Sequence, residues 1–181
     1  MKILFFSDLH GQTRQLTALF HKQDMASVDW IINCGDFFSG YSPQEASTQE
    51  LSRLYLQHPA QKLDVLGNND SSSLLALISK HPYAQGLSKT IGNMQITLTH
   101  GHLGSAETFH THNAQATWQI FAEGHTHVAR LKKEGNTIYL NPGSLSYSRS
   151  QLPTTYAILN EKTLSIKSLD SDRVFYSEFL P

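Results

Sequence analysis

The sequence predicts an α/β fold in which two packed sheets are flanked by helices. Two observations predict it. In the first half of the chain, short apolar runs alternate with segments whose apolar residues recur at helical spacing. In the second half, short β-compatible runs follow one another with turn-forming residues between them. Strands separated by helices favour right-handed βαβ units on a largely parallel sheet.

The first half contains three candidate strands and three candidate helices. The expected strands are 2–7, 30–34 and 62–66. The expected helices are 13–24, the stretch after Pro43, and a segment that begins near 71–73. Helices of this size between short strands are typical of crossover connections, so the three strands are expected to be parallel.

The second half is rich in strands. The expected strands are 94–99, 119–122, 128–132, 137–140, 156–159, 164–169 and 174–179. Glu134-Gly135-Asn136 separates the third and fourth of these and predicts a hairpin. No internal repeat, low-complexity tract or linker divides the chain, so one domain is expected over 1–181.

Composition restricts the function classes. The formal net charge of −1 gives no long-range attraction to nucleic acid or to an anionic membrane. The longest apolar stretches fall far short of the ~20 residues that span a bilayer. Cys34 is the single cysteine, which excludes an intramolecular disulfide and a thiolate zinc site. We expect a cytoplasmic protein with no membrane association and no strong nucleic-acid signal.

Polar residues with metal-binding side chains follow five of the expected strands. The five segments are Asp8-Leu9-His10-Gly11, Gly35-Asp36, Gly67-Asn68-Asn69-Asp70, His100-Gly101-His102 and Gly124-His125-Thr126-His127. Open α/β sheets place their sites at the carboxyl ends of strands, so these segments are expected to meet at one edge. The glycines fit this picture, because sharp turns and close backbone approach require a missing Cβ.

The candidate metal ligands are two carboxylates, one carboxamide and four imidazoles: Asp8, His10, Asp36, Asn68, His100, His125 and His127. Nitrogen and oxygen donors without sulfur suit divalent Mn, Zn, Fe, Ni or Mg. Seven donors are too many for one tetrahedral ion and suit two ions that share a bridging carboxylate. Two dications would leave the site positive despite the two carboxylates, which favours a bound phosphate and an activated water.

These motifs, in this order and spacing, resemble those of the calcineurin-like metallophosphoesterases. The chain length, Asn141-Pro142-Gly143-Ser144 and the lack of a cap domain resemble the smallest branch, the YfcE-type phosphodiesterases. The resemblance implies a four-layer α-β-β-α sandwich of two mixed sheets between helices. It also implies hydrolysis of a small phosphodiester by in-line attack of a metal-bridging hydroxide. Relatives commonly associate, so a dimer or tetramer is possible.

The resemblance also assigns the ligands. Asp8, His10 and His127 hold the first metal, and Asn68, His100 and His125 hold the second. Asp36 bridges the two metals, and manganese is the ion that we expect in both positions. Asp36, Asn68 and His100 are the residues expected to be catalytic as well as metal-binding.

Asn69 departs from the family pattern. Many members carry a histidine at this position, which is thought to protonate the leaving group. A carboxamide cannot donate a catalytic proton at useful cost, so we expect a preference for activated esters, such as aryl phosphodiesters. The YfcE-type branch also tends to lack this histidine.

Several residues have simpler interpretations. Asp8 is also a candidate helix N-cap, and Asp36 and Asn68 are candidate Asx-turn residues. His110-Thr111-His112 repeats the spacing of His125 and His127 but has no neighbouring glycine, which favours a solvated surface. His102 supports the site or packs beside it, and Asn141–Ser144 is expected to form a tight turn behind the site.

Two rival functions remain open at this point. The retromer subunit that resembles these phosphodiesterases is a non-enzymatic scaffold with a degraded pocket, whereas all seven ligand positions here hold competent donors. The other rival is an enzyme on the same fold that acts on phosphomonoesters, cyclic nucleotides or nucleic acid ends.

Overall fold

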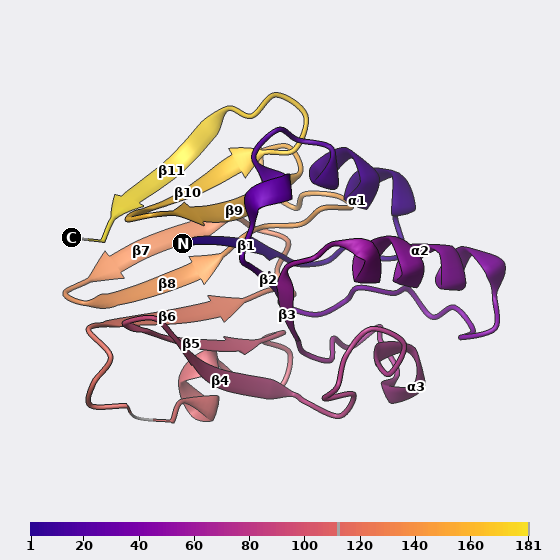
Figure 1. Cartoon of the computed structure of the whole chain (residues 1–181), viewed down its shortest axis with the longest axis horizontal. Helices are drawn as coiled ribbons and strands as arrows, with labels where there is room; N and C mark the ends of the chain where they lie inside the picture. The colour runs from indigo at the N-terminus through magenta and orange to yellow at the C-terminus, as the bar shows by residue number, and fades with distance from the viewer. Residues whose placement is uncertain (112, 181) are drawn as a thin grey trace.

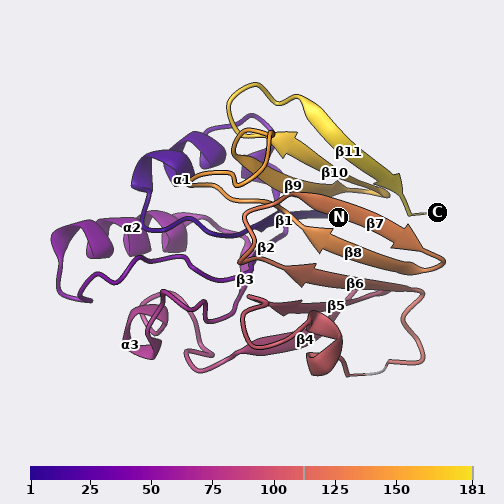
Figure 2. The same cartoon turned by 180° about the vertical axis from the view of Figure 1, so that it is seen from behind.

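The computed structural model describes residues 1–111 and 113–180. Two mixed sheets stack on each other, with the α-helices gathered at one side of the molecule (Figures 1 and 2). The first sheet has the strand order β11-β10-β9-β1-β2-β3, and the second has the order β4-β5-β6-β8-β7. The predicted pair of mixed sheets is therefore confirmed.

The first sheet is built around three parallel strands, β1 (Lys2–Phe6), β2 (Trp30–Asn33) and β3 (Gln61–Asp64). Helices α1 (Thr13–Phe20) and α2 (Ala46–Gln57) are the crossovers between them. The sheet continues through β9 (Thr155–Asn160), β10 (Thr163–Ser168) and β11 (Val174–Phe179), which run antiparallel to their neighbours. The predicted βαβ units are confirmed.

The second sheet has its own parallel centre. Three neighbouring strands are parallel: β5 (Met94–Thr99), β6 (Trp118–Glu123) and β8 (Thr137–Asn141). The edge strands β4 (Gly86–Ile91) and β7 (Arg130–Glu134) are antiparallel to β5 and β8. The pairing of β7 with β8 confirms the predicted hairpin.

Strand β1 separates two apolar layers because it is buried on both faces. Ile3 and Phe5 face the second sheet and pack in one core with residues of β5, β6 and β8. Leu4 and Phe6 point the other way and pack in a second core with α1, α2 and the short helix α3 (Ser72–Leu75). Alternate residues of a strand point to opposite faces, so a continuous apolar run is what a doubly covered strand requires.

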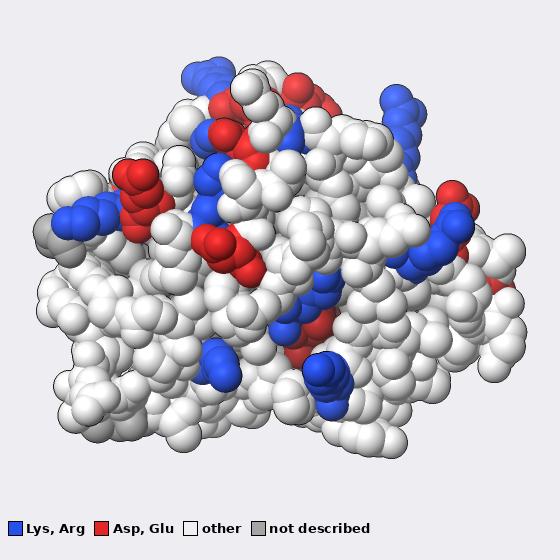
Figure 3. Space-filling model, viewed as in Figure 1, with Lys and Arg blue, Asp and Glu red and all other residues white. Residues whose placement is uncertain are grey.

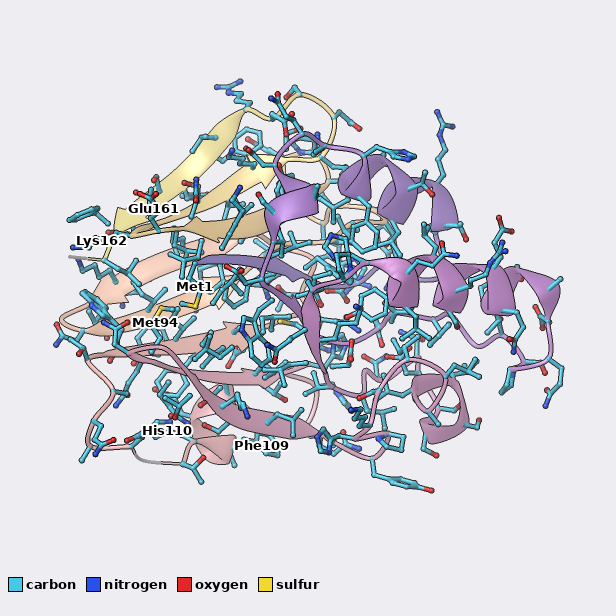
Figure 4. All side chains as sticks on the ribbon, viewed as in Figure 1. Met1, Met94, Phe109, His110, Glu161 and Lys162 are labelled. Carbon is cyan, nitrogen blue, oxygen red and sulfur yellow. The ribbon has the colours of Figure 1, made fainter. Side chains whose placement is uncertain are left out.

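The outer face of the second sheet carries little helix. The 3-10 helix η2 (Ala106–Phe109), which ends at the labelled Phe109 in Figure 4, packs against β4, β5 and β6. Phe109 occupies the space that a side chain at Gly86 would need. Among the described residues no helix is long and apolar enough to cross a membrane. On the face shown in Figure 3, cationic side chains are interspersed with anionic ones and form no continuous basic stripe.

The structure corrects two predicted helix boundaries and adds one strand that the sequence did not predict. The helix predicted over 13–24 ends at Phe20, and the 3-10 turn η1 (Met25–Ser27) follows. Helix α3 is a single turn rather than a longer helix. Strand β4 was not predicted, because three of its six residues are Ser88, Lys89 and Thr90. An edge strand does not need a continuous apolar run, so its polar residues hid it.

Candidate metal centre

The expected ligands meet at the carboxyl ends of the two sheets. The loops after β1, β2 and β3 bring Asp8, His10, Asp36 and Asn68 from the first sheet, and the loops after β5 and β6 bring His100, His125 and His127 from the second. The structure thus gathers the donors that the sequence assigned to five separate strands, as expected for parallel strands that run in one direction.

Main-chain hydrogen bonds join the first two loops. Asp8 N–H donates to the Gly35 carbonyl at 3.1 Å, and His10 N–H donates to the Asp36 carbonyl at 2.9 Å. The loop after β6 is joined to them, since His125 N–H donates to Asp8 Oδ2 at 3.1 Å. The relative positions of the carboxylates and imidazoles are therefore set by backbone contacts.

The backbone at the site is unusual. Seven described residues other than glycine have positive φ. Five of them are expected ligands: Asp8, His10, Asp36, His125 and His127, with φ between 49° and 67°. Such residues cost of order 1 kcal/mol or more each and concentrate at functional sites.

Glycines permit close contacts between the loops, as the sequence suggested. A Cβ at Gly67 would meet Asp36 N at 2.1 Å, and one at Gly124 would meet Ser7 Oγ at 1.9 Å. A Cβ at Gly35 would meet the His100 ring at 2.8 Å. An alanine at any of these positions would therefore push the loops apart.

The first group of converging donors is Asp8, His10 and His127, whose donor atoms all lie within 4.8 Å of one another. His127 Nδ1 lies 3.0 Å from the Tyr147 carbonyl, which can only accept, so Nδ1 carries the proton and Nε2 has a free lone pair. That Nε2 lies 3.1 Å from Asp8 Oδ1, which is buried and has no hydrogen-bond donor among the described residues. Two acceptor atoms this close favour a cation that binds both of them.

The second group is Asp8, Asp36 and His100. His100 Nδ1 donates to the Cys34 carbonyl at 2.8 Å, so its Nε2 faces Asp36 Oδ2 at 3.3 Å and Asn68 Oδ1 at 3.0 Å. When His100 is neutral, its Nε2 is an acceptor like the other two atoms, and this arrangement again favours a cation.

Asn69 holds Asp36 with two hydrogen bonds. Its main-chain N–H donates to Asp36 Oδ1 at 2.8 Å, and its side-chain amide donates to Asp36 Oδ2 at 2.7 Å. The residue that departs from the family pattern thus contacts the carboxylate expected to bridge the two metals.

Burial and these contacts shift the pKa values. Burial raises the pKa of Asp36, but the hydrogen bonds from His100 and Asn69 outweigh burial and bring it well below its usual range. Burial lowers the pKa of His100, but the Asp36 carboxylate outweighs burial and the net shift is upward. For His10 burial dominates and the pKa is lowered. In the absence of a metal, a proton on His100 supplies part of the missing positive charge.

His125 and His102 lie beside the second group. The His125 ring is 5.1 Å from the His100 ring, and the His102 ring is 5.4 Å from it. His102 Nδ1 is buried without a hydrogen-bond partner among the described residues. Burial, with the nearby His100 and His125, lowers the pKa of His102.

The simpler interpretations fare differently. Asp8 does not cap α1, whose N-cap is Gln12. His110 was expected on a solvated surface; it is partly buried, with its ring 5.3 Å from that of Phe121 on the outer face of the second sheet. His112 lies outside the described residues.

Residues outside the ligand set support the site, and the sequence had placed two of them, Asn141 and Ser144, in a turn behind it. Ser144 Oγ donates to the Asp8 carbonyl at 2.9 Å, and Asn141 Nδ2 donates to the Gly124 carbonyl at 2.8 Å, so the turn at 141–144 is joined to two ligand loops. Asp70 accepts hydrogen bonds from the main chains of Phe38 and Gly67, and burial raises its pKa to about 6. The aspartate in Gly-Asn-x-Asp was the signal that could have found Asp70.

A pocket of about 610 Å³ opens above these groups. Its lining includes the expected ligands His10, Asp36, Asn68, His125 and His127, and also Tyr41, Tyr147 and Arg149. The residues fit a pair of divalent cations, because the donors are nitrogen and oxygen and Asp8 Oδ1 is buried without a donor. A substrate could therefore enter this pocket from solvent.

The chain matches known proteins along most of its length. A model of the calcineurin-like phosphoesterase superfamily domain matches residues 1–164. The phosphodiesterase YfcE of Escherichia coli strain K12 is 27% identical, with 96% of this chain and 95% of YfcE covered. The probable metallophosphoesterase YsnB of Bacillus subtilis strain 168 is 28% identical, with 88% of this chain and 83% of YsnB covered.

Solved structures share the fold. The structure of the E. coli phosphoesterase YfcE superposes with a TM-score of 0.80 at 24% identity, and all of both chains is covered. Wild-type Vps29 of Entamoeba histolytica, complexed with Zn²⁺, has a TM-score of 0.58 at 21% identity, with 98% of this chain and 97% of Vps29 covered. The predicted fold class is confirmed by these likenesses.

Proposed function

The chain belongs to the calcineurin-like phosphoesterase superfamily, and on that premise we propose that it is a dinuclear metal-dependent phosphodiesterase acting on small phosphodiesters. The observation that carries the proposal is the convergence of two donor groups that share the buried carboxylate of Asp8. Asp36 Oδ2 lies between the groups, 3.7 Å from His10 Nε2 and 3.3 Å from His100 Nε2. Membership of the family implies divalent metal ions, and we infer two of them, with manganese preferred over Zn, Fe, Ni or Mg.

Each residue has a proposed role. Asp8, His10 and His127 would hold one ion, and Asn68, His100 and His125 the other, with Asp36 between them. The bound ions would activate water and neutralise charge on the phosphoryl oxygens. The tautomers fixed by Cys34 and Tyr147 keep a lone pair of His100 and of His127 aimed into the site.

The proposal is tested with bis-p-nitrophenyl phosphate and added Mn²⁺, with Asp36→Ala as control. We expect turnover that depends on metal in the wild type and is lost in the variant. Equal turnover in both proteins would contradict the proposal. No metal-stimulated turnover would favour a scaffold role, and a higher rate on p-nitrophenyl phosphate would favour a phosphomonoesterase.

Asn69 leads to a prediction about the leaving group. We expect the wild-type rate to fall steeply from aryl to alkyl diesters, because no group at position 69 protonates a poor leaving group. In Asn69→His we expect the rate on alkyl diesters to rise relative to the rate on aryl diesters. The gain should reach about 10²-fold if the new histidine acts as a general acid. Rates over a series of leaving groups of increasing pKa measure the slope. An unchanged slope in the variant would remove the general-acid explanation.

A further inference from the structure

Tyr147 and Arg149 extend from the loop after β8 into the pocket, and we name them the ring arm. The arm is anchored to an expected metal ligand at two points. The Tyr147 carbonyl accepts from His127 Nδ1 at 3.0 Å, and Arg149 N–H donates to the His127 carbonyl at 3.2 Å. Its position relative to the reacting phosphate is therefore set by the same residue that would hold the metal.

The ring of Tyr147 lies directly beside the donors. Its centroid is 4.4 Å from the His127 ring and 5.9 Å from the His10 ring, and the planes of Tyr147 and His10 are only 27° apart. Tyr147 is nevertheless 49% exposed. It therefore offers an aromatic surface to the pocket next to the position expected for phosphorus.

Arg149 orients this ring. Its Nη2 donates to the Tyr147 hydroxyl at 3.1 Å, and its guanidinium carbon lies 5.6 Å from the ring centroid. Among the described residues that line the pocket, Arg149 is the only lysine or arginine. Tyr41, which packs against the backbone of Gly11 beside His10, adds a second aromatic wall.

We propose that the ring arm binds the ester group that stays on phosphorus, and that it selects phosphodiesters in which this group carries a planar ring, such as an aryl or nucleoside ester. The inference rests on the proposed phosphodiesterase function. Stacking of one base on an aromatic side chain changes binding by about tenfold to a hundredfold. An alkyl group of the same diester could not stack, so the arm discriminates between the two.

Three substrates with one leaving group isolate this effect. Bis-p-nitrophenyl phosphate, thymidine 5′-p-nitrophenyl phosphate and methyl p-nitrophenyl phosphate all release p-nitrophenolate and differ in the group that remains. We expect the wild type to have the higher kcat/KM on the first two. In Tyr147→Leu the ratio of each planar substrate to the methyl substrate should fall about tenfold, mainly through KM.

Matched variants separate stacking from a structural role. Tyr147→Phe keeps the ring and should keep most of the preference. Tyr83→Leu removes a tyrosine that is 78% exposed and lies outside the pocket lining, so it should leave the ratios unchanged. Bound metal is measured in every variant, because loss of contact with His10 or His127 would lower all three rates together. An equal loss on all three substrates, or unchanged ratios in Tyr147→Leu, overturns the proposal.

The outcome remains distinct from that of the proposed function. If the metal-loaded wild type hydrolyses none of the three substrates, the phosphodiesterase proposal fails. The ring arm is then tested by calorimetric binding of thymidine 5′-monophosphate and methyl phosphate. Tighter binding of the nucleotide that is lost in Tyr147→Leu supports the arm, and equal binding of the two ligands overturns it.

Discussion

Two buried carboxylates at the ends of neighbouring parallel strands are held in opposite ways. Asp36 follows β2 and is 1% exposed, and Asp64 ends β3 and is 2% exposed. Burial raises the pKa of both, but at Asp36 the hydrogen bonds from His100 and Asn69 reverse the shift. Burial keeps the pKa of Asp64 at about 6, despite hydrogen bonds from Tyr55 and Asn33. Near-equal exposure therefore gives opposite charge preferences.

The neighbours of the two carboxylates differ. Asp36 accepts two N–H groups of Asn69 and lies 3.3 Å from His100, which can carry a positive charge. Asp64 accepts from a neutral hydroxyl at 2.6 Å and from a neutral amide at 3.3 Å. The opposing charges of Lys62 and Asp70 do not overcome its burial. Neutral donors only partly replace lost hydration, whereas a nearby cation favours the ionised form directly. The contacts with His100 and Asn69 thus keep Asp36 ionised.

The strongest test of this comparison is the same substitution at both positions. Asp36→Asn keeps the shape of the side chain but removes the charge that would bridge two cations. We expect Mn²⁺-stimulated turnover to fall about 10³-fold or more, which corresponds to about 4 kcal/mol. The amount of bound metal should fall as well. Asp64→Asn, assayed identically, should stay within a fewfold of the wild type. Activity within tenfold of the wild type in Asp36→Asn would contradict the assigned bridge.

The second test concerns stability and pH. The folded-state pKa of Asp64 is raised from 3.8 to about 6, so its favourable contribution is fully present below about pH 4 and is lost as pH rises through 6. Asp64→Asn removes this dependence. Relative to the wild type, the free energy of unfolding of the variant should rise between pH 4 and pH 6, by up to about 3 kcal/mol.

Urea unfolding of the metal-free proteins at several pH values measures this difference. Both hydrogen bonds described at Asp64 end on Oδ1, so the asparagine oxygen can accept them. Asp70, whose pKa is also raised to about 6, is present in both proteins, so only its interaction with Asp64 remains in the difference. A constant difference in stability across this pH range would show that Asp64 is not the titrating group.

The sequence was sufficient to predict the candidate donors and both sheets apart from strand β4. Apolar runs such as Ile3–Phe6 need burial on both faces, which defines central strands, and glycine beside a metal-binding residue indicates a sharp turn at a strand end. The order of the motifs also predicted the family, and the family resemblance predicted how the donors divide between two ions.

Other features depend on long-range contacts that no local pattern encodes. Strand β4 is recognisable only once β5 is beside it, because its sequence Gly-Leu-Ser-Lys-Thr-Ile is largely polar. The ring arm depends on hydrogen bonds between Tyr147, Arg149 and His127, about twenty residues apart in the chain. The contact of Asn69 with Asp36 could not be predicted either. The family pattern indicates only that position 69 lacks a histidine, and says nothing of what the asparagine contacts.

That contact gives the smallest of the expected effects. Asn69→Ala removes the side-chain hydrogen bond to Asp36 Oδ2 and leaves the main-chain bond to Oδ1 in place. Residues that hold a metal ligand typically contribute 10- to 100-fold to metal affinity or activity, so we expect a loss in that range. Asn69→Asp should lose more than Asn69→Ala, because it brings a second negative charge against Asp36. Metal titration and kcat/KM on bis-p-nitrophenyl phosphate measure both variants. If Asn69→Ala binds metal and turns over substrate like the wild type, Asp36 is held by His100 and the main chain alone. The difference between Asp36 and Asp64 would then come from the charge on the His100 imidazole and not from Asn69.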